Sequence, residues 1–291
     1  MKKNNFFTLV ICSYKRETLI KKCLTNVLKN TLKPKKIIII DQNDNDKTNK
    51  ISKQLFLKFK YSKFKIIKNI KNIGLTKSKN ISLNYINTKY VVFLDDDIMT
   101  HKNFFKNLVD LIYIKKANGV CGVITNLKKS KIKNFFYYLT NFGPYKDNRY
   151  YFQNYKKYKN KKLYYSKINS LPGGITCFNT NIFKKLKFDE KYVVHNYEDV
   201  DFSIRLKKII PNYKFFVSFK ALCTDALEKK QKENISSRFK FMYLLFLKNK
   251  SFYFLIIFIL SFIGLLFSNL KNLNFSIIRD FYIILLSQKI R

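Results

Sequence analysis

The sequence predicts an α/β domain built on a mostly parallel sheet that helices cover on both faces. Apolar runs alternate with segments of helical spacing as far as Thr125. Some runs are apolar throughout, such as Lys36–Asp41 with its four consecutive isoleucines. A strand with one solvated face would alternate apolar and polar residues, so these strands should be buried on both faces. Helices between such strands indicate crossover connections within a parallel sheet.

The expected elements alternate along the chain. Strands are predicted at Phe6–Ser13, Lys36–Asp41, Phe64–Ile70, Tyr90–Leu94 and Val120–Thr125. Helices are predicted at Glu17–Asn30, Lys47–Lys60, Leu75–Ile86, Phe104–Lys116 and Thr180–Leu186, and a further helix begins at Glu198.

One segment, Lys128–Lys167, breaks this alternation. It is basic, rich in Tyr and Phe, and without a clear period. Two interpretations are open: a loop over a site whose tyrosines stack on a sugar or base, or an ordinary amphipathic insertion.

Basic residues far outnumber acidic residues, and the two kinds are distributed differently along the chain. The chain has 58 Lys and Arg against 18 Asp and Glu, a net charge of +40. Such a charge suits nucleic acid or an anionic membrane, but the lysines are spread evenly and indicate a compositional bias. The acids instead gather in three groups of three: Asp41/Asp44/Asp46, Asp95/Asp96/Asp97 and Glu198/Asp199/Asp201. A nucleic-acid-binding protein would leave these groups unexplained, because carboxylates repel phosphate.

Polar residues follow directly on three of the predicted strands. They are Ser13-Tyr14, Asp41 and Asp95–Asp97. Because ligands of parallel α/β sheets bind beyond the carboxyl ends of strands, these residues should share one edge. Three adjacent carboxylates at the end of a buried strand repel one another and are partly desolvated. A divalent metal that carries phosphates is the leading candidate to neutralise them.

The C-terminal part has a different character. Ser251–Leu270 carries no charge and is flanked by lysines, and its length suits one bilayer crossing of roughly 20 residues. We therefore expect a domain at 1–225, a basic amphipathic linker helix at 226–250 and a membrane-associated segment at 251–291. The alternative is a buried pair of C-terminal helices. The basic and aromatic residues from 236 onward suit an anionic membrane surface.

Four segments together resemble the family 2 glycosyltransferases, which have the GT-A fold. They are Thr8–Arg16, Ile37–Asp46, Asn72–Asn80 with the following Val91–Asp97, and Asn196–Leu206. Each is weak alone, but their order and spacing are specific, and the resemblance covers roughly Phe6 to Phe219. It implies transfer of a sugar from a nucleotide-sugar donor to an acceptor hydroxyl, usually with inversion.

The resemblance also implies roles for individual residues. Donor contacts would come from Ser13, Tyr14, Arg16, Asp41, Lys79, Asp95 and Asp96. Asp95 and Asp97 would form the Asp-x-Asp motif that holds Mg²⁺ or Mn²⁺, with Asp96 near the ribose. Asp199 would be the catalytic base with Glu198 beside it, and Gly173, Gly174 and His195 would lie on the acceptor side.

Two positions depart from the family pattern. Many relatives have a late His that helps to ligate the metal, whereas the corresponding stretch here is Ala221–Ala226. Cys223, Asp225 or water would have to substitute. Lys79 stands where relatives have Arg, so a bidentate contact to phosphate is lost.

The five cysteines form no C-x-x-C pair, which favours buried thiols over a zinc or redox motif.

The sequence therefore predicts an inverting, metal-dependent glycosyltransferase at the cytoplasmic face of the membrane, anchored by its C-terminus. Its acceptor would be a saccharide or a lipid-linked sugar in the synthesis of surface polysaccharide or glycoconjugate. The alternatives are a basic nucleic-acid-binding protein and a non-catalytic membrane-anchored protein with a decayed transferase domain. No specific nucleic acid partner is expected.

Overall fold

The structure is a computed structural model of the 291-residue chain. It describes residues 7–69, 72–127, 149–190 and 198–226, and ten positions of the C-terminal part, namely 247, 248, 251, 252, 255, 256, 258–260 and 263.

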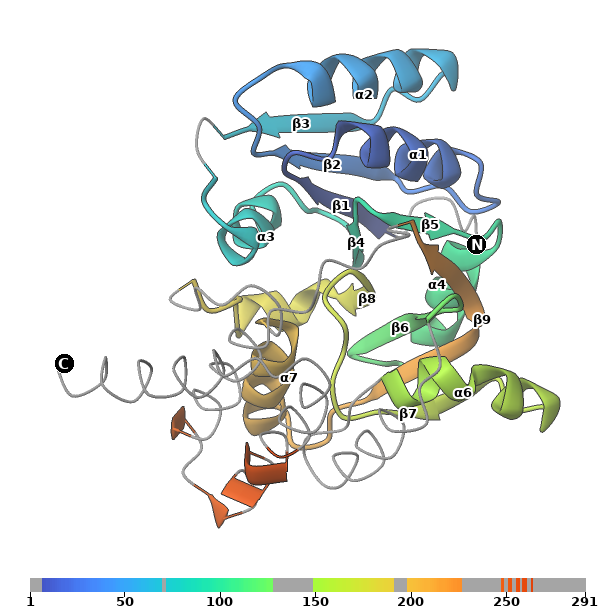
Figure 1. Ribbon diagram of the computed structural model, residues 1–291, viewed down its shortest axis with the longest axis vertical. Coiled ribbons are helices and arrows are strands. Elements are labelled where there is room, and N and C mark those ends of the chain that lie inside the picture. Colours follow the sequence, from blue (N-terminus) through green and yellow to red (C-terminus); the bar gives the residue numbers. More distant parts are fainter. Residues whose placement is uncertain are drawn as a thin grey trace, which may run out of the picture.

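The described strands form one nine-stranded mixed sheet (Figure 1). Along the main path the strand order is β3-β2-β1-β4-β8-β6-β9-β5, and β7 pairs with β9. The strands are β1 (Phe7–Ser13), β2 (Lys36–Asp41), β3 (Phe64–Lys68), β4 (Tyr90–Asp95), β5 (Ile98–Thr100), β6 (Gly119–Ile124), β7 (Tyr165–Lys167), β8 (Ile175–Asn179) and β9 (Phe215–Asp225).

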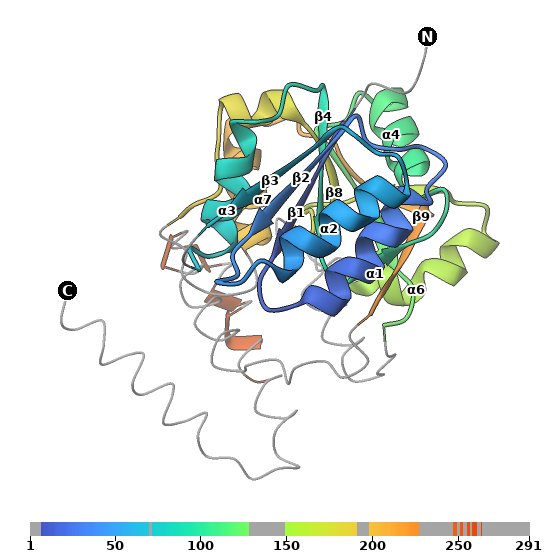
Figure 2. The same ribbon diagram turned by 90° about the horizontal axis from the view of Figure 1, so that it is seen from above.

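Helices cover both faces of the parallel strands. They are α1 (Glu17–Leu28), α2 (Lys47–Lys58), α3 (Leu75–Leu83), α4 (Phe104–Ile114), α6 (Arg149–Asn160) and α7 (Glu198–Ile209), with a 3₁₀ turn η2 at Thr180–Lys184. Figure 2 shows α1 and α2 on one face of β1–β3 and α3 on the other. This arrangement explains the continuous apolar runs, because Ile37 to Ile40 are all fully buried.

The sheet is parallel in β3-β2-β1-β4, as the sequence predicts, and β6 also pairs in parallel with β9. Strand β8 is an exception, since it runs antiparallel to both β4 and β6. It starts from the Pro172–Gly174 turn, at the edge where β4 ends, and so must run away from that edge. Strands β5, β7, β8 and β9 were not predicted.

Part of the aromatic segment 128–167 is regular structure. Residues 128–148 lie outside the described residues, but α6 and β7 cover much of the rest. Tyr158 of α6 stacks on Phe219 of β9 with ring centroids 5.0 Å apart, and Tyr151 contacts the same ring. These two tyrosines are therefore packing residues, as expected of an amphipathic insertion.

The predicted membrane segment falls mostly outside the described residues. Among those that are described, no helix is both long and apolar enough to span a bilayer. The linker helix predicted at 226–250 lies almost wholly outside them as well, except at 226, 247 and 248.

Candidate active site

Three parallel strands end side by side at one edge of the sheet. Ser13, at the end of β1, pairs with Asp41 at the end of β2, and Cys12 pairs with Asp95 at the end of β4. The Ser13 hydroxyl donates a 2.7 Å hydrogen bond to Asp96 Oδ2. The structure thus brings together the polar residues that the strand pattern places at one edge.

Arg16 balances part of the charge of the aspartate triplet. Its Nη1 donates to Asp96 Oδ1 at 3.1 Å and to Asp97 Oδ2 at 2.8 Å. Burial nevertheless raises the pKa of Asp95, Asp96 and Asp97 to about 6 in each case, and repulsion from neighbouring carboxylates adds to the effect. Lys79 lowers the pKa of Asp95, as Arg16 does, but these two cations do not offset the effect of burial, so the triplet is short of positive charge.

The donor atoms of the triplet fit a hard divalent cation, because Mg²⁺ and Mn²⁺ prefer carboxylate oxygen. Within the described ranges, no group of three or more His, Cys, Asp or Glu side chains is arranged to hold a metal by itself. A cation on Asp95 and Asp97 would therefore need further ligands from a diphosphate and water, as Mg²⁺ sites commonly have.

The two side chains considered as substitutes for the late histidine differ in position. Cys223 is fully buried, and its Sγ points to the carbonyl oxygen of Val123 at 3.4 Å. Asp225 instead lies beside the triplet: Ala226 N–H bonds to Asp97 O at 2.8 Å, and the charge of Asp225 helps to raise the pKa of Asp97. Of the two, only Asp225 is near the candidate metal ligands.

Asp41 presents a buried acceptor on the other side of β1. Its Oδ1 accepts hydrogen bonds from the backbone N–H and the side-chain amide of Asn43, at 3.1 and 2.7 Å. Its Oδ2 is buried and finds no hydrogen-bond partner among the described residues. A buried acceptor left unpaired is costly, so this oxygen is suited to an N–H or O–H of a ligand. Tyr14, which directly follows β1, is 37% exposed.

The acid-rich helix α7 begins at Glu198, as predicted. The Lys79 ammonium on α3 donates to Glu198 Oε1 at 2.8 Å, and both side chains are buried. This position differs from the expected contact to donor phosphate. Asp199 keeps a partly exposed surface, yet burial and the neighbouring charge of Glu198 raise its pKa to about 7.

The turn at Gly173 and Gly174 joins the two acidic groups. Gly173 N–H donates to Asp199 Oδ2 at 2.8 Å, and Asp95 N–H donates to Gly174 O at 2.9 Å. A Cβ on Gly174 would lie 1.8 Å from Asp95 Oδ2, which only glycine permits. The turn therefore contacts Asp199 through Gly173 and Asp95 through Gly174. His195 lies outside the described residues and remains a predicted acceptor contact.

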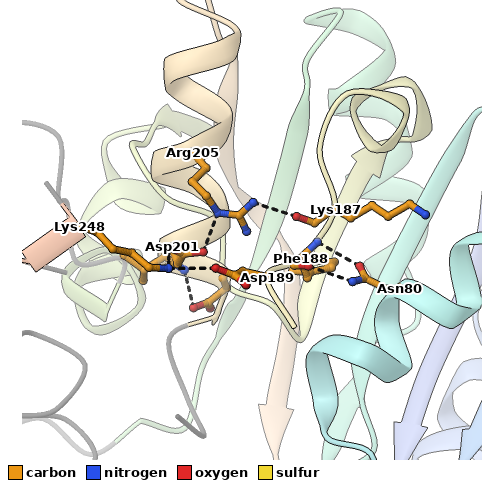
Figure 3. A network of polar contacts seen from close by, with 9 residues as sticks. Asn80, Lys187, Phe188, Asp189, Asp201, Arg205 and Lys248 are labelled. Carbon is orange, nitrogen blue, oxygen red and sulfur yellow. Dashed lines mark hydrogen bonds and ion pairs between the residues drawn. The ribbon is translucent and has the colours of Figure 1, made fainter. Parts of the chain in front are cut away.

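A polar network holds the N-terminal half of α7 (Figure 3). Asp201 Oδ2 accepts from Arg205 Nε at 2.7 Å, and Asp201 Oδ1 accepts from Lys248 at 3.0 Å. Lys248 also pairs with Asp189 at 3.1 Å. The third acid of the predicted group, Asp201, is therefore a structural residue that ties the C-terminal part of the chain to α7.

Sequence reasoning missed Asn43 and Asn80. Asn43 Oδ1 accepts the backbone N–H of Lys15, so the asparagine links the loops after β1 and β2 while it orients Asp41. The Asn80 side chain bonds both the N–H and the C=O of Phe188, which fixes the loop before α7. Both residues lie in segments that resemble the family, Ile37–Asp46 and Asn72–Asn80, but their partners belong to other loops and become visible only in the folded structure.

Comparison with known proteins identifies the family of the chain. The family model described as glycosyl transferase family 2 matches residues 8–187, more than half of the chain. Glycosyltransferase GlyG of Streptococcus pneumoniae is 21% identical over 137 residues, 47% of this chain and 44% of that protein. Processive diacylglycerol beta-glycosyltransferase of Mycoplasma genitalium is 26% identical over 121 residues, 41% of this chain and 35% of that protein. The matches span less than half the length of these curated relatives.

Solved structures share the fold. Mannosyltransferase PcManGT of Pyrobaculum calidifontis, in complex with GDP-Man and Mn²⁺, superposes with a TM-score of 0.64 at 13% identity, over 91% of this chain and 73% of that one. TarS residues 1–349 of S. aureus give 0.57 at 16% identity, over 84% and 65%. At these identities the likeness shows the fold alone, which is GT-A.

Proposed function

Because the chain belongs to glycosyl transferase family 2 and is a glycosyltransferase, we propose that it transfers a sugar from a nucleotide-sugar donor to an acceptor hydroxyl with inversion, assisted by a divalent metal. One observation carries the proposal: Asp95 and Asp199 flank the same Gly173–Gly174 turn. We assign Asp95 to the side of the departing diphosphate. The oxygens of Asp199 accept the backbone N–H of Gly173 and of Val200, both at 2.8 Å, and their remaining lone pairs would take the proton of an attacking hydroxyl.

The residues divide the chemistry between them. Asp199, with a pKa of about 7, accepts the proton of the acceptor hydroxyl as its oxygen attacks the anomeric carbon. The bond from that carbon to the diphosphate breaks on the opposite face, and its electron pair leaves with the diphosphate. A cation on Asp95 and Asp97 would stabilise that leaving charge as a Lewis acid. Direct displacement needs one base and inverts the configuration.

Donor recognition is proposed for the edge formed by β1 and β2. The unpaired Oδ2 of Asp41 would accept a hydrogen bond from the base or ribose, and the exposed ring of Tyr14 would stack on the base. Arg16 already bonds Asp96 and Asp97, so it would exchange part of this contact for the donor phosphates when metal binds. PcManGT and TarS are solved with GDP-Man and Mn²⁺ and with UDP respectively, which supports a nucleotide-diphosphate donor.

A membrane-proximal acceptor is part of the proposal. Phe252, Ile256, Ile259 and Ile263 are exposed at spacings of four, three and four residues, which suits one face of a helix. Lysines flank the uncharged segment 251–270, as expected near anionic lipid. The Mycoplasma relative is named for transfer to diacylglycerol. These features support our proposal that the enzyme acts at the cytoplasmic face of the membrane, on a saccharide or lipid-linked acceptor for surface polysaccharide or glycoconjugate.

The test separates donor binding from transfer. Nucleotide sugars are first screened by thermal shift with and without Mn²⁺, since a bound donor raises the melting temperature by mass action. With the donor so identified, Asp199→Asn should keep the donor-induced shift and lose about 10²- to 10⁴-fold in transfer rate. Asp110→Asn, which alters a partly exposed carboxylate paired with Lys106 on α4, is the matched control and should transfer normally. Full transfer by Asp199→Asn would refute the assignment of the base.

A further inference from the structure

Lys79 occupies a position that a donor-binding lysine would not be expected to take. Its side chain is 2% exposed, and its Nζ lies 2.8 Å from Oε1 of Glu198, a residue 119 positions further along the chain. The rings of Phe93 and Phe188 stand 5.8 and 5.3 Å from the ammonium. A cation enclosed in this way lacks an open path to the phosphates of a donor.

The Gly173 turn closes over this ion pair. A Cβ on Gly173 would lie 2.7 Å from Lys79 Nζ, 2.8 Å from Glu198 Oε1 and 3.3 Å from Asp199 Cβ. The same residue donates its N–H to Asp199 Oδ2. Lys79, Glu198 and Asp199 are therefore packed against one backbone unit, and movement of the ion pair would move the partner of Asp199.

We propose that Lys79 is a positioning residue for Asp199: by holding Glu198 at the start of α7, it fixes the orientation of the base against the Gly173 turn rather than binding donor phosphate. This inference rests on the proposed role of Asp199.

The charges around Asp199 support this role. Glu198 raises the pKa of Asp199, and Lys79 lowers it. Lys79 itself is faced by Glu198, Asp95 and Asp199, which hold its pKa above the ordinary value and keep it charged. The Cys12 thiol on β1 adds no charge there, because burial raises its pKa to about 12. Lys79 is thus the cation that lets the base ionise near neutral pH.

The experiment compares Lys79→Met, Lys79→Arg and the double variant Lys79→Met/Glu198→Gln in the full chain. The substrate is whichever of UDP-glucose, UDP-N-acetylglucosamine and GDP-mannose the unaltered protein turns over fastest. Lys79→Met should lower kcat about 100-fold, as a displaced catalytic group does, with the donor KM unchanged within about twofold. In the pH profile of kcat for Lys79→Met, the acid limb should move to higher pH. Lys79→Arg should have a kcat at least about tenfold higher than that of Lys79→Met.

The double variant guards against a folding defect. Removing both charges avoids a buried unpaired carboxylate, so its melting temperature should exceed that of Lys79→Met. Its acid limb should return toward that of the unaltered protein, since the opposite effects of Lys79 and Glu198 on Asp199 are both gone. Its kcat should stay at least about tenfold low, because the contact that orients α7 is missing.

Two results would overturn the inference. One is a tenfold or greater rise in donor KM, or in the Kd for UDP or GDP with Mn²⁺, at unchanged kcat, which would mark Lys79 as a phosphate ligand. The other is an unchanged kcat in both Lys79→Met and the double variant. Asp199→Asn is assayed in parallel: if it transfers normally, the proposed base is wrong, whereas an inactive Asp199→Asn with normal Lys79 variants refutes only the positioning role.

Discussion

Two neighbouring glycines allow the two halves of the proposed mechanism to be perturbed separately. The same substitution, Gly→Ala, adds one methyl group on either side of a single peptide. At Gly174 the new Cβ would lie 1.8 Å from Asp95 Oδ2 and 2.1 Å from its Cγ. At Gly173 it would meet Lys79 Nζ and Glu198 Oε1 at 2.7 and 2.8 Å.

The magnitude for Gly174→Ala follows from these distances. Ordinary van der Waals contact needs about 3.5 Å, so the Asp95 carboxylate must shift by more than about 1 Å. Metal–oxygen bonds to Mg²⁺ tolerate only a narrow range near 2.1 Å, and disturbed ligand orientation typically costs about 10- to 100-fold in metal affinity. We therefore expect Mn²⁺-dependent binding of UDP or GDP to weaken by about 1.4–2.8 kcal/mol.

Isothermal titration calorimetry of each variant with UDP or GDP, with and without Mn²⁺, provides the assay. Gly173→Ala is the matched control: it should bind the nucleotide and Mn²⁺ almost normally but turn over slowly, because the methyl group displaces the Lys79–Glu198 pair. Circular dichroism would establish that both variants fold. Equal Mn²⁺-dependent binding by Gly174→Ala and the unaltered protein would refute the placement of the metal beside Asp95.

Three further outcomes are expected. With the pKa of Asp199 near 7, kcat should fall about tenfold per pH unit below that value, and a flat profile down to pH 5 would exclude Asp199 as the base. Burial raises the pKa of Asp96 in the folded state to about 6, so between about pH 4 and pH 6 the folded state binds more protons than the unfolded state. Without metal, the free energy of unfolding should therefore fall as the pH rises through this interval. A melting temperature that rises over the same interval would contradict this. Lys248→Met should lower the free energy of unfolding by about 1 kcal/mol, or the melting temperature by about 2–4 °C. Lys106→Met, which removes an i,i+4 ion pair of α4, should lower it by less than about 0.5 kcal/mol. Equal losses in the two variants would show that Lys248 does not stabilise α7.

The parallel half of the fold was predictable because its signals are local. Lys36–Asp41 was predicted with its observed bounds, since four isoleucines in a row fit only a strand buried on both faces. Strand β9 was missed because its residues read as the tail of the domain. Its partners are β6 and two short strands that the sequence does not mark.

The candidate site was predictable in its members and less so in its contacts. Strand ends placed Ser13, Asp41 and Asp95 at one edge without any knowledge of the fold. The partner of Lys79 was not predictable, because Glu198 lies 119 residues away and only the packing of α3 against the start of α7 brings them together. A lysine in a charged motif gives no local signal that it will be buried.

Metal-dependent binding of the donor nucleotide tests the proposed role of the aspartate triplet most directly. Calorimetric titration of UDP or GDP into the unaltered protein should give at least about tenfold tighter binding with Mn²⁺ than without it. Asp97→Asn should abolish that enhancement, and Asp110→Asn should retain it. Full enhancement by Mn²⁺ in Asp97→Asn, or equal binding with and without Mn²⁺ in the unaltered protein, would contradict a metal–diphosphate site on the triplet.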